Sequence, residues 1–249
     1  MKDAGFSAQD LRLGGYDATS MKIAGFSAHD LKHAGYDETS IKGADFSAEE
    51  LKRAGFDAKF VRDRGHDPTS MKEAGFFAQD LRQAGFDAKS MKDVFSPSEL
   101  RNAGYTAKNM KDADFSAEDL KHAGYAAKSM KDAGYTPKIM TSAGFSAQEL
   151  KHADYDAKSM KDAKFPAQQL RVAGYDAKSM KEAKFSAQEL RVAGYDATSM
   201  KDAKFPAQEL CNARYDAKSM KDAKFSAQEL RLGGYDAKSM RMQSSPLKS

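Results

Sequence analysis

An aromatic side chain recurs every ten residues along almost the whole chain, and an aliphatic side chain stands five residues after each ring. The aromatic series begins Phe6, Tyr16, Phe26, has His66 in place of one ring, and contains a single step of nine that ends at Phe95. Leu or Met fills the aliphatic position in nearly every unit. Self-similarity at a fixed short period indicates a repeat architecture, here of about 24 units.

Phe units and Tyr units mostly alternate, and their polar residues alternate with them. Residues 185–191 (Phe, Ser, Ala, Gln, Glu, Leu, Arg) are typical of a Phe unit, and residues 175–181 (Tyr, Asp, Ala, Lys, Ser, Met, Lys) of a Tyr unit. The full period is therefore about 20 residues, made of two inequivalent halves and present in about 12 copies.

Each ten-residue unit carries the signals of one very short helix. Ser, Thr or Asp follows most rings, and these side chains cap the free amides of a helix start. Many Phe units add Glu or Asp three residues later, which predicts a capping box. Pro68, Pro97 and Pro137 fall at the expected first helical position. Gly precedes most rings, where a left-handed residue would end the preceding helix.

The ring is placed to contact two helices. It can pack on the Leu or Met of the helix that has just ended, and also on the Leu or Met of the helix that follows. Helices of about six residues are unstable in isolation, so neighbouring units must supply the stability. The pattern predicts an all-α fold, an α-solenoid of about 24 short helices paired into about 12 twenty-residue helical hairpins. Lys164, Lys184, Lys204 and Lys224 replace Gly before the ring, and we expect turns there that need not be left-handed.

The unit at Ala24-Gly25-Phe26-Ser27-Ala28, completed by Leu31 and Lys32, resembles the tandem-repeat proteins of algae and other protists that are built from Ala-Gly-Phe-Ser-Ala-x-x-Leu-Lys units. The resemblance extends over residues 1 to about 242. It implies a helical repeat fold of ten- or twenty-residue units and brings no activity with it.

The pattern is less regular in the first part of the chain. Phe46 and Phe56 interrupt the alternation, Phe77 replaces a cap, and one residue is missing before Phe95. We therefore expect an N-terminal repeat block over 1–94, a regular C-terminal block over 95–241 and a flexible tail over 242–249. The irregular stretch is interpreted either as drift in a tolerant array or as a bend that shapes the molecule to a partner.

Composition limits the size of any core and the choice of compartment. Leu, Ile, Val and Phe make up only 36 of 249 residues, while the net charge is +4, so a thin core spread along a line fits better than one large core. The single cysteine, Cys211, excludes an internal disulfide framework, and no apolar run reaches the roughly 18 residues of a membrane span. A reducing compartment such as the cytoplasm is the default; an organelle such as the chloroplast stays open if a targeting segment has been removed.

Few residues suggest chemistry. His29 and His33 lie one helical turn apart with Asp30 between them, but no third ligand stands nearby, and Asp30 is expected in a capping box. Copies of one unit do not bring unlike groups into one pocket, as an active site requires. We therefore expect no catalytic residue, no metal site, no cofactor and no enzymatic activity.

A basic residue directly follows the Leu or Met in every unit except those with Thr141 and Cys211. These cations can complement the helix dipole and lay their stems over the thin core, or they can form a linear surface for polyanions or anionic lipid. The candidate surface, here called the basic stripe, consists of Lys111, Lys121, Lys131, Lys151, Lys161, Arg171, Lys181, Arg191, Lys201, Lys221 and Arg231.

Two functions follow from the sequence. The first is a non-enzymatic structural scaffold or linker subunit that binds other proteins within a larger assembly. The alternative is a polyanion- or membrane-surface-binding repeat array that uses the basic stripe, with nucleic acid or anionic lipid as partner.

Overall fold

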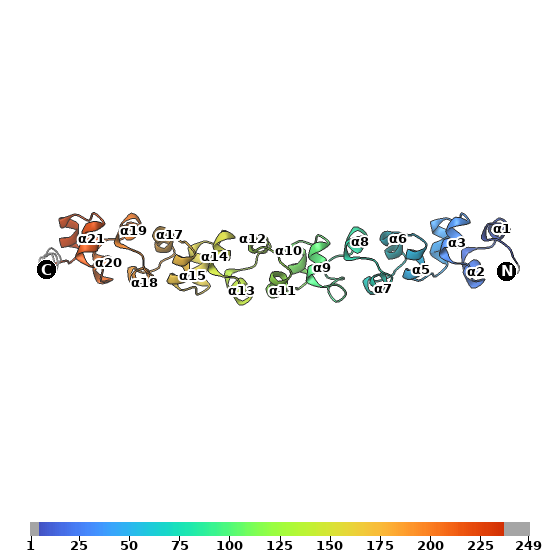
Figure 1. The fold of residues 1–249 in the computed structure, drawn as a ribbon, viewed down its shortest axis with the longest axis horizontal. Helices are drawn as coiled ribbons and strands as arrows, with labels where there is room; N and C mark the ends of the chain where they lie inside the picture. The colour runs from blue at the N-terminus through green and yellow to red at the C-terminus, as the bar shows by residue number, and fades with distance from the viewer. Residues whose placement is uncertain (1–4, 237–249) are drawn as a thin grey trace, which may run out of the picture. The chain divides into compact units, whose positions relative to one another are not determined.

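The computed structural model describes residues 5–236, in which every regular element is an α-helix of six residues (Figure 1). The chain divides into two compact units, Met1–Tyr125 and Ala126–Ser249. The first unit contains α1 (Ala8–Leu13), α2 (Ala18–Ile23), α3 (Ala28–His33), α4 (Glu38–Gly43), α5 (Ala48–Arg53), α6 (Ala58–Asp63), α7 (Pro68–Glu73), α8 (Ala78–Gln83), α9 (Pro97–Asn102), α10 (Ala107–Asp112) and α11 (Ala117–His122). The second contains α12 (Ala127–Asp132), α13 (Pro137–Ser142), α14 (Ala147–His152), α15 (Ala157–Asp162), α16 (Ala167–Val172), α17 (Ala177–Glu182), α18 (Ala187–Val192), α19 (Ala197–Asp202), α20 (Ala207–Asn212), α21 (Ala217–Asp222) and α22 (Ala227–Leu232).

The helices begin where the caps predict. At α18 the Ser186 hydroxyl accepts a hydrogen bond from the Glu189 amide, and the Glu189 carboxylate accepts one from the Ser186 amide, which completes the capping box. At α17 the Asp176 carboxylate accepts the Ser179 amide at 2.7 Å. The backbone amide and hydroxyl of Ser179 hold the pKa of Asp176 below its usual value, against the effect of burial.

The helices end in a Schellman motif that the ring completes. In α3 the Tyr36 amide donates to the Leu31 carbonyl at 3.1 Å, and the Gly35 amide donates to the Lys32 carbonyl at 3.1 Å. Gly35 has φ +82°, the left-handed conformation that this motif needs. Because the ring follows the left-handed residue, the same motif that ends the helix turns the ring back onto it.

The prediction for the lysines that replace Gly is wrong. Lys164, Lys184, Lys204 and Lys224 all have positive φ, between 60° and 69°. The Lys184 amide still donates to the Lys181 carbonyl at 2.8 Å, as a glycine amide does in the other units. The burial of the following ring thus imposes the left-handed turn even where a side chain makes it costly.

The described residues contain 22 of the roughly 24 predicted helices. Residues 88–94 form successive turns instead of a helix, although Asp87 still accepts the Ser90 amide and Met91 is fully buried. The Phe95 amide bonds to the carbonyl four residues back, on Met91, because the missing residue is the left-handed one. The last predicted helix falls beyond residue 236, outside the described residues.

Packing confirms the predicted all-α solenoid. Each helix packs mainly on the helix two places further along, as in α3 on α5 and α6 on α8 in the first unit and α15 on α17 and α17 on α19 in the second. Consecutive helices such as α5 and α6 also touch. Alternate helices therefore form two columns in each unit, and one helix from each column makes one level, which corresponds to one copy of the full repeat.

The core is a thin line of Leu, Met and rings. Leu190 and Met200 are fully buried, and the Phe205 ring is 4% exposed. Phe6 and Tyr16, in the first two units, are 55% and 39% exposed, and no helix among the described residues precedes α1 to pack against their rings. The predicted blocks 1–94 and 95–241 stay a prediction, and the predicted tail over 242–249 lies outside the described residues.

Candidate functional site

Most cations of the basic stripe lie between successive helices of a column. Lys181, near the end of α17, is half-buried, and its Nζ lies 4.7 Å from the centre of the Phe205 ring. The same ammonium donates to the carbonyls of Ala203 and Lys204, at 3.3 and 2.5 Å. A cation over an aromatic face is attracted by the ring quadrupole, and the carbonyls at a helix C-terminus carry partial negative charge. Each such cation therefore joins its own helix to the next helix of the same column.

This contact recurs along the second unit, always between a cation and the third ring that follows it in the chain. The pairs are Lys131 with Tyr155 at 5.2 Å, Lys151 with Tyr175 at 5.4 Å, Lys161 with Phe185 at 4.4 Å, Arg171 with Tyr195 at 5.9 Å and Lys201 with Phe225 at 4.7 Å. The lysines also donate to the carbonyl of the residue before the ring, on Asp154, Gly174, Lys184 and Lys224 respectively. In the first unit Lys32 over Phe56 repeats the arrangement at 4.4 Å.

The remaining stripe residues occupy the same helical position. Lys111 and Lys121 are half-buried in α10 and α11. Arg191 is half-buried, and the positive charge it places near Tyr215 lowers the pKa of that phenol against the larger effect of burial. Lys221 and Arg231 are exposed, and the described part of the chain holds no third ring after either of them.

A second ladder links the tyrosines of one column. The Tyr195 hydroxyl donates to the backbone carbonyl of Tyr175 at 2.5 Å, and the Tyr215 hydroxyl donates to that of Tyr195 at 2.8 Å. Burial raises the pKa of both phenols to about 12. This ladder was not predicted from the sequence, although the regular return of Tyr in every second unit was a signal for it.

His66, which replaces the Phe or Tyr of its unit, makes the same contact. Its Nε2 lies 3.1 Å from the carbonyl oxygen of Phe46, which belongs to the unit two places earlier. A ring nitrogen in the place of a phenol oxygen explains why a histidine is accepted at this position.

The other candidate residues are placed in helix ends. His29 and His33 lie with ring centroids 4.2 Å apart in α3, and Asp30 accepts the Ser27 amide at 3.0 Å, as its capping role predicts. Within residues 5–236, no three His, Cys, Asp or Glu side chains gather as a metal site. Cys211 is a half-buried thiol in α20.

The sequence matches the family described as Decapeptide repeat region over residues 1–68, 39–106, 55–127, 94–165, 124–197 and 174–244. The chain belongs to the decapeptide repeat family. No curated protein matches this decapeptide-repeat chain. None of the helices among its described residues has the length and apolar character needed to cross a bilayer.

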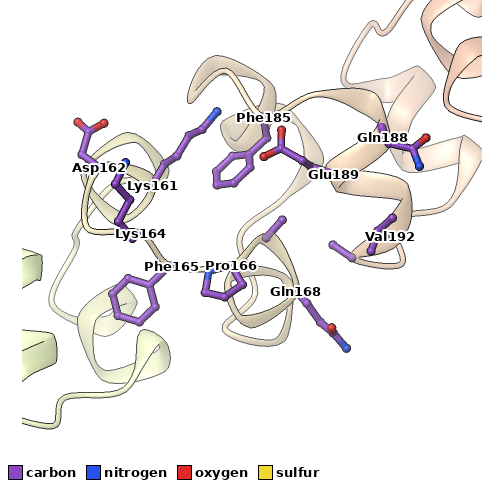
Figure 2. A pocket seen from close by; sticks show the side chains of 12 residues that line it. Lys161, Asp162, Lys164, Phe165, Pro166, Gln168, Phe185, Gln188, Glu189 and Val192 are labelled. Atoms are coloured by element: carbon purple, nitrogen blue, oxygen red, sulfur yellow. The ribbon is translucent and has the colours of Figure 1, made fainter.

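Neighbouring grooves lie beside Phe rings in the second unit of the decapeptide-repeat protein. One, of about 640 Å³, lies between Phe165 and Phe185, with Lys161 and Lys164 on one side and Val192 on the other (Figure 2). The other, of about 690 Å³, lies one level earlier, between Phe145 and Phe165. The second is lined by apolar side chains, glutamine amides and hydroxyls, and the first adds the charged side chains of Lys161, Asp162, Lys164 and Glu189 to an apolar wall. An apolar surface with a polar rim is suited to contacts with another chain.

Proposed function

We propose that this protein is a non-enzymatic scaffold or linker subunit that binds other proteins within a larger assembly. The observation that carries the proposal is a set of exposed apolar side chains at the ends of helices that follow Phe rings in the second unit, the Phe column. The set is adjacent at Val172 and Val192, and the polar Asn212 at the end of α20 separates it from Leu232. Val172 is 77% exposed, Val192 69% and Leu232 73%, each at the last position of its helix. In the Tyr column the same position holds exposed charges, such as Asp162 and Glu182.

An exposed apolar set beside apolar grooves fits a protein partner better than a polyanion. Contiguous exposed apolar surface marks interaction sites in soluble proteins. The stripe cations that a polyanion would need are largely engaged by rings and carbonyls of the fold, as at Lys161 and Lys181. Repetition of one unit also supports a structural role, because it does not place unlike catalytic groups in one pocket.

The experiment is a gentle affinity purification of the tagged protein from its native source, washed at low and then high salt, with the retained proteins quantified. A triple variant, Val172→Asn, Val192→Asn and Leu232→Asn, removes the apolar set. The matched control changes the same helical position in the other column, with Asp162→Asn, Glu182→Gln and Asp202→Asn. We expect a stoichiometric partner that survives high salt with the native chain and the control and is lost with the triple variant. A native protein that is monomeric, with no stoichiometric partner, overturns the proposal.

A polyanion- or membrane-surface-binding array is the second candidate, and the lysines before the Phe rings favour it. Lys164, Lys184, Lys204 and Lys224 are exposed, and among the described residues they form no ion pair with an acidic side chain. Salt-titrated binding to duplex DNA and to anionic vesicles tests this candidate. Negligible binding at low salt removes it, whereas binding that is lost when all four lysines become glutamine supports it.

A further inference from the structure

One Phe ring of the second unit lacks the cation that the fold places over the later Phe rings. Thr141 stands at the position from which a cation would cover Phe165, whereas Lys161, Lys181 and Lys201 stand at the equivalent positions for Phe185, Phe205 and Phe225. At the other exception to the stripe, the half-buried thiol of Cys211 occupies the position.

Thr141 does not replace the missing contacts. Its hydroxyl donates back to the Pro137 carbonyl of its own helix at 2.7 Å, as a helical threonine commonly does. The carbonyls of Ala163 and Lys164 are equivalent to those that Lys181 binds at Ala203 and Lys204. Among the described residues no side chain donates to either carbonyl at this level.

The vacated position opens into a groove. Thr141, Phe145, Phe165, Pro166 and Val172 are among the residues that line the space of about 690 Å³. Lys164 does not line it, since its side chain lies on the neighbouring groove (Figure 2). An aromatic ring and apolar walls thus meet in this groove, at the position from which an ammonium group of the chain itself covers the later Phe rings.

We propose that this position, the Thr141 site, binds a lysine or arginine side chain presented by a partner chain. The proposal rests on the proposed function, because a partner protein supplies the cation. The fold gives the precedent: at the equivalent cation–ring pairs in the second unit, a basic side chain reaches from one chain segment over a ring carried by another. The Pro166 and Val172 side chains provide the apolar surface that the stem of a long basic side chain covers.

The site can be tested on the full chain with a small probe. n-Butylammonium represents a lysine side chain, and n-butanol is its neutral counterpart. The readout is the NMR signal of the Phe165 ring as each probe is titrated. We expect a saturable shift with n-butylammonium and none with n-butanol, because the face of the ring attracts a positive charge.

Two substitutions make the test reciprocal. Thr141→Lys supplies the missing cation from within and is expected to abolish the shift at Phe165 while raising the melting temperature. Lys161→Thr removes the resident cation over Phe185 and is expected to create a second site, seen as a new saturable shift at that ring. Thr141→Ser is the conservative control and should bind as the native chain does.

The inference is overturned if n-butanol shifts Phe165 as much as n-butylammonium does, or if Thr141→Lys binds the probe like the native chain. These results depend on the site alone. Partner capture by the native chain tests the scaffold function separately, so failure of the Thr141 site and failure of the scaffold function are distinguished.

Discussion

The stripe lysines act as connectors between levels, and the ammonium of Lys181 is the clearest case. Lys181→Met keeps the apolar stem but removes the charge over Phe205 and the donors to Ala203 and Lys204. We expect a loss of about 1 kcal/mol in the free energy of unfolding, the sum of a cation–ring contact and hydrogen bonds to exposed carbonyls. Urea denaturation measures it. Lys178→Met, in the same helix but exposed, should change stability by less than about 0.5 kcal/mol. Equal effects of the two substitutions would contradict the connector role.

The hydroxyl of Tyr195 is a buried donor whose loss leaves a backbone carbonyl unpaired. Tyr195→Phe removes the hydrogen bond to the Tyr175 carbonyl and nothing else. The expected cost is about 1–2 kcal/mol, because the Tyr175 carbonyl then stays buried without a partner. Phe units show that the ring itself is accepted in the fold, so the circular dichroism spectrum should not change. A variant as stable as the native chain would mean that water or a neighbour satisfies this carbonyl.

The tyrosine ladder also sets an upper pH limit. Burial raises the pKa of Tyr175, Tyr195 and Tyr215 to about 12 in the folded chain, from the ordinary value near 10. The neutral phenol is thus favoured by folding, so its contribution is complete below pH 10 and is lost as the pH rises from about 10 through about 12. Urea midpoints across this window should fall. Absorbance at about 295 nm reports phenolate alone, and it must show these tyrosines ionising at higher pH in native than in unfolded protein.

At the scale of a single helix and its turn, the left-handed residue controls how the unit ends. Lys184 has φ +66°, a conformation that costs a residue with a side chain about 1 kcal/mol relative to glycine. We expect Lys184→Gly to be more stable than Lys184→Ala by about that amount, because both lose the ammonium and only one retains the strain. Thermal unfolding of the pair gives the difference. Equal stability would indicate that the turn relaxes without a side-chain penalty.

Local signals predicted the helix boundaries because all of their determinants lie within one unit. The cap at Ser186, the buried Leu190 and the ring that closes the next turn follow one another within a single repeat unit. The exception at residues 88–94 is also local, since the chain is one residue short of a left-handed turn there. The turn at Lys184 was mispredicted because intrinsic preference opposes it and ring burial decides it.

At the scale of the whole molecule, the contacts that define the candidate site could not be predicted from one unit. Lys161 meets Phe185, and Tyr195 meets Tyr175, only because alternate helices stack into columns. The sequence showed that a cation and a ring recur, but not that each cation belongs to the third ring after it. The Thr141 site can be recognised only when that pairing of cations and rings is known.

The column arrangement predicts which deletions the molecule tolerates. Removal of residues 185–204 takes one unit from each column and joins Lys184 to Phe205, a junction of the native type. Removal of residues 185–194 shifts the later Phe units into the other column. The Tyr hydroxyls can then donate to backbone carbonyls of Phe units, just as His66 contacts the backbone carbonyl of Phe46. Both variants should fold, with the urea m-value reduced in proportion to the residues removed.

Removal of residues 185–199 instead brings Met200 to the position of a ring. The cap and the Schellman motif then lose register, so cooperative unfolding should be lost. If this 15-residue deletion proved as stable as the two others, the ten-residue unit would not be the structural repeat of the fold.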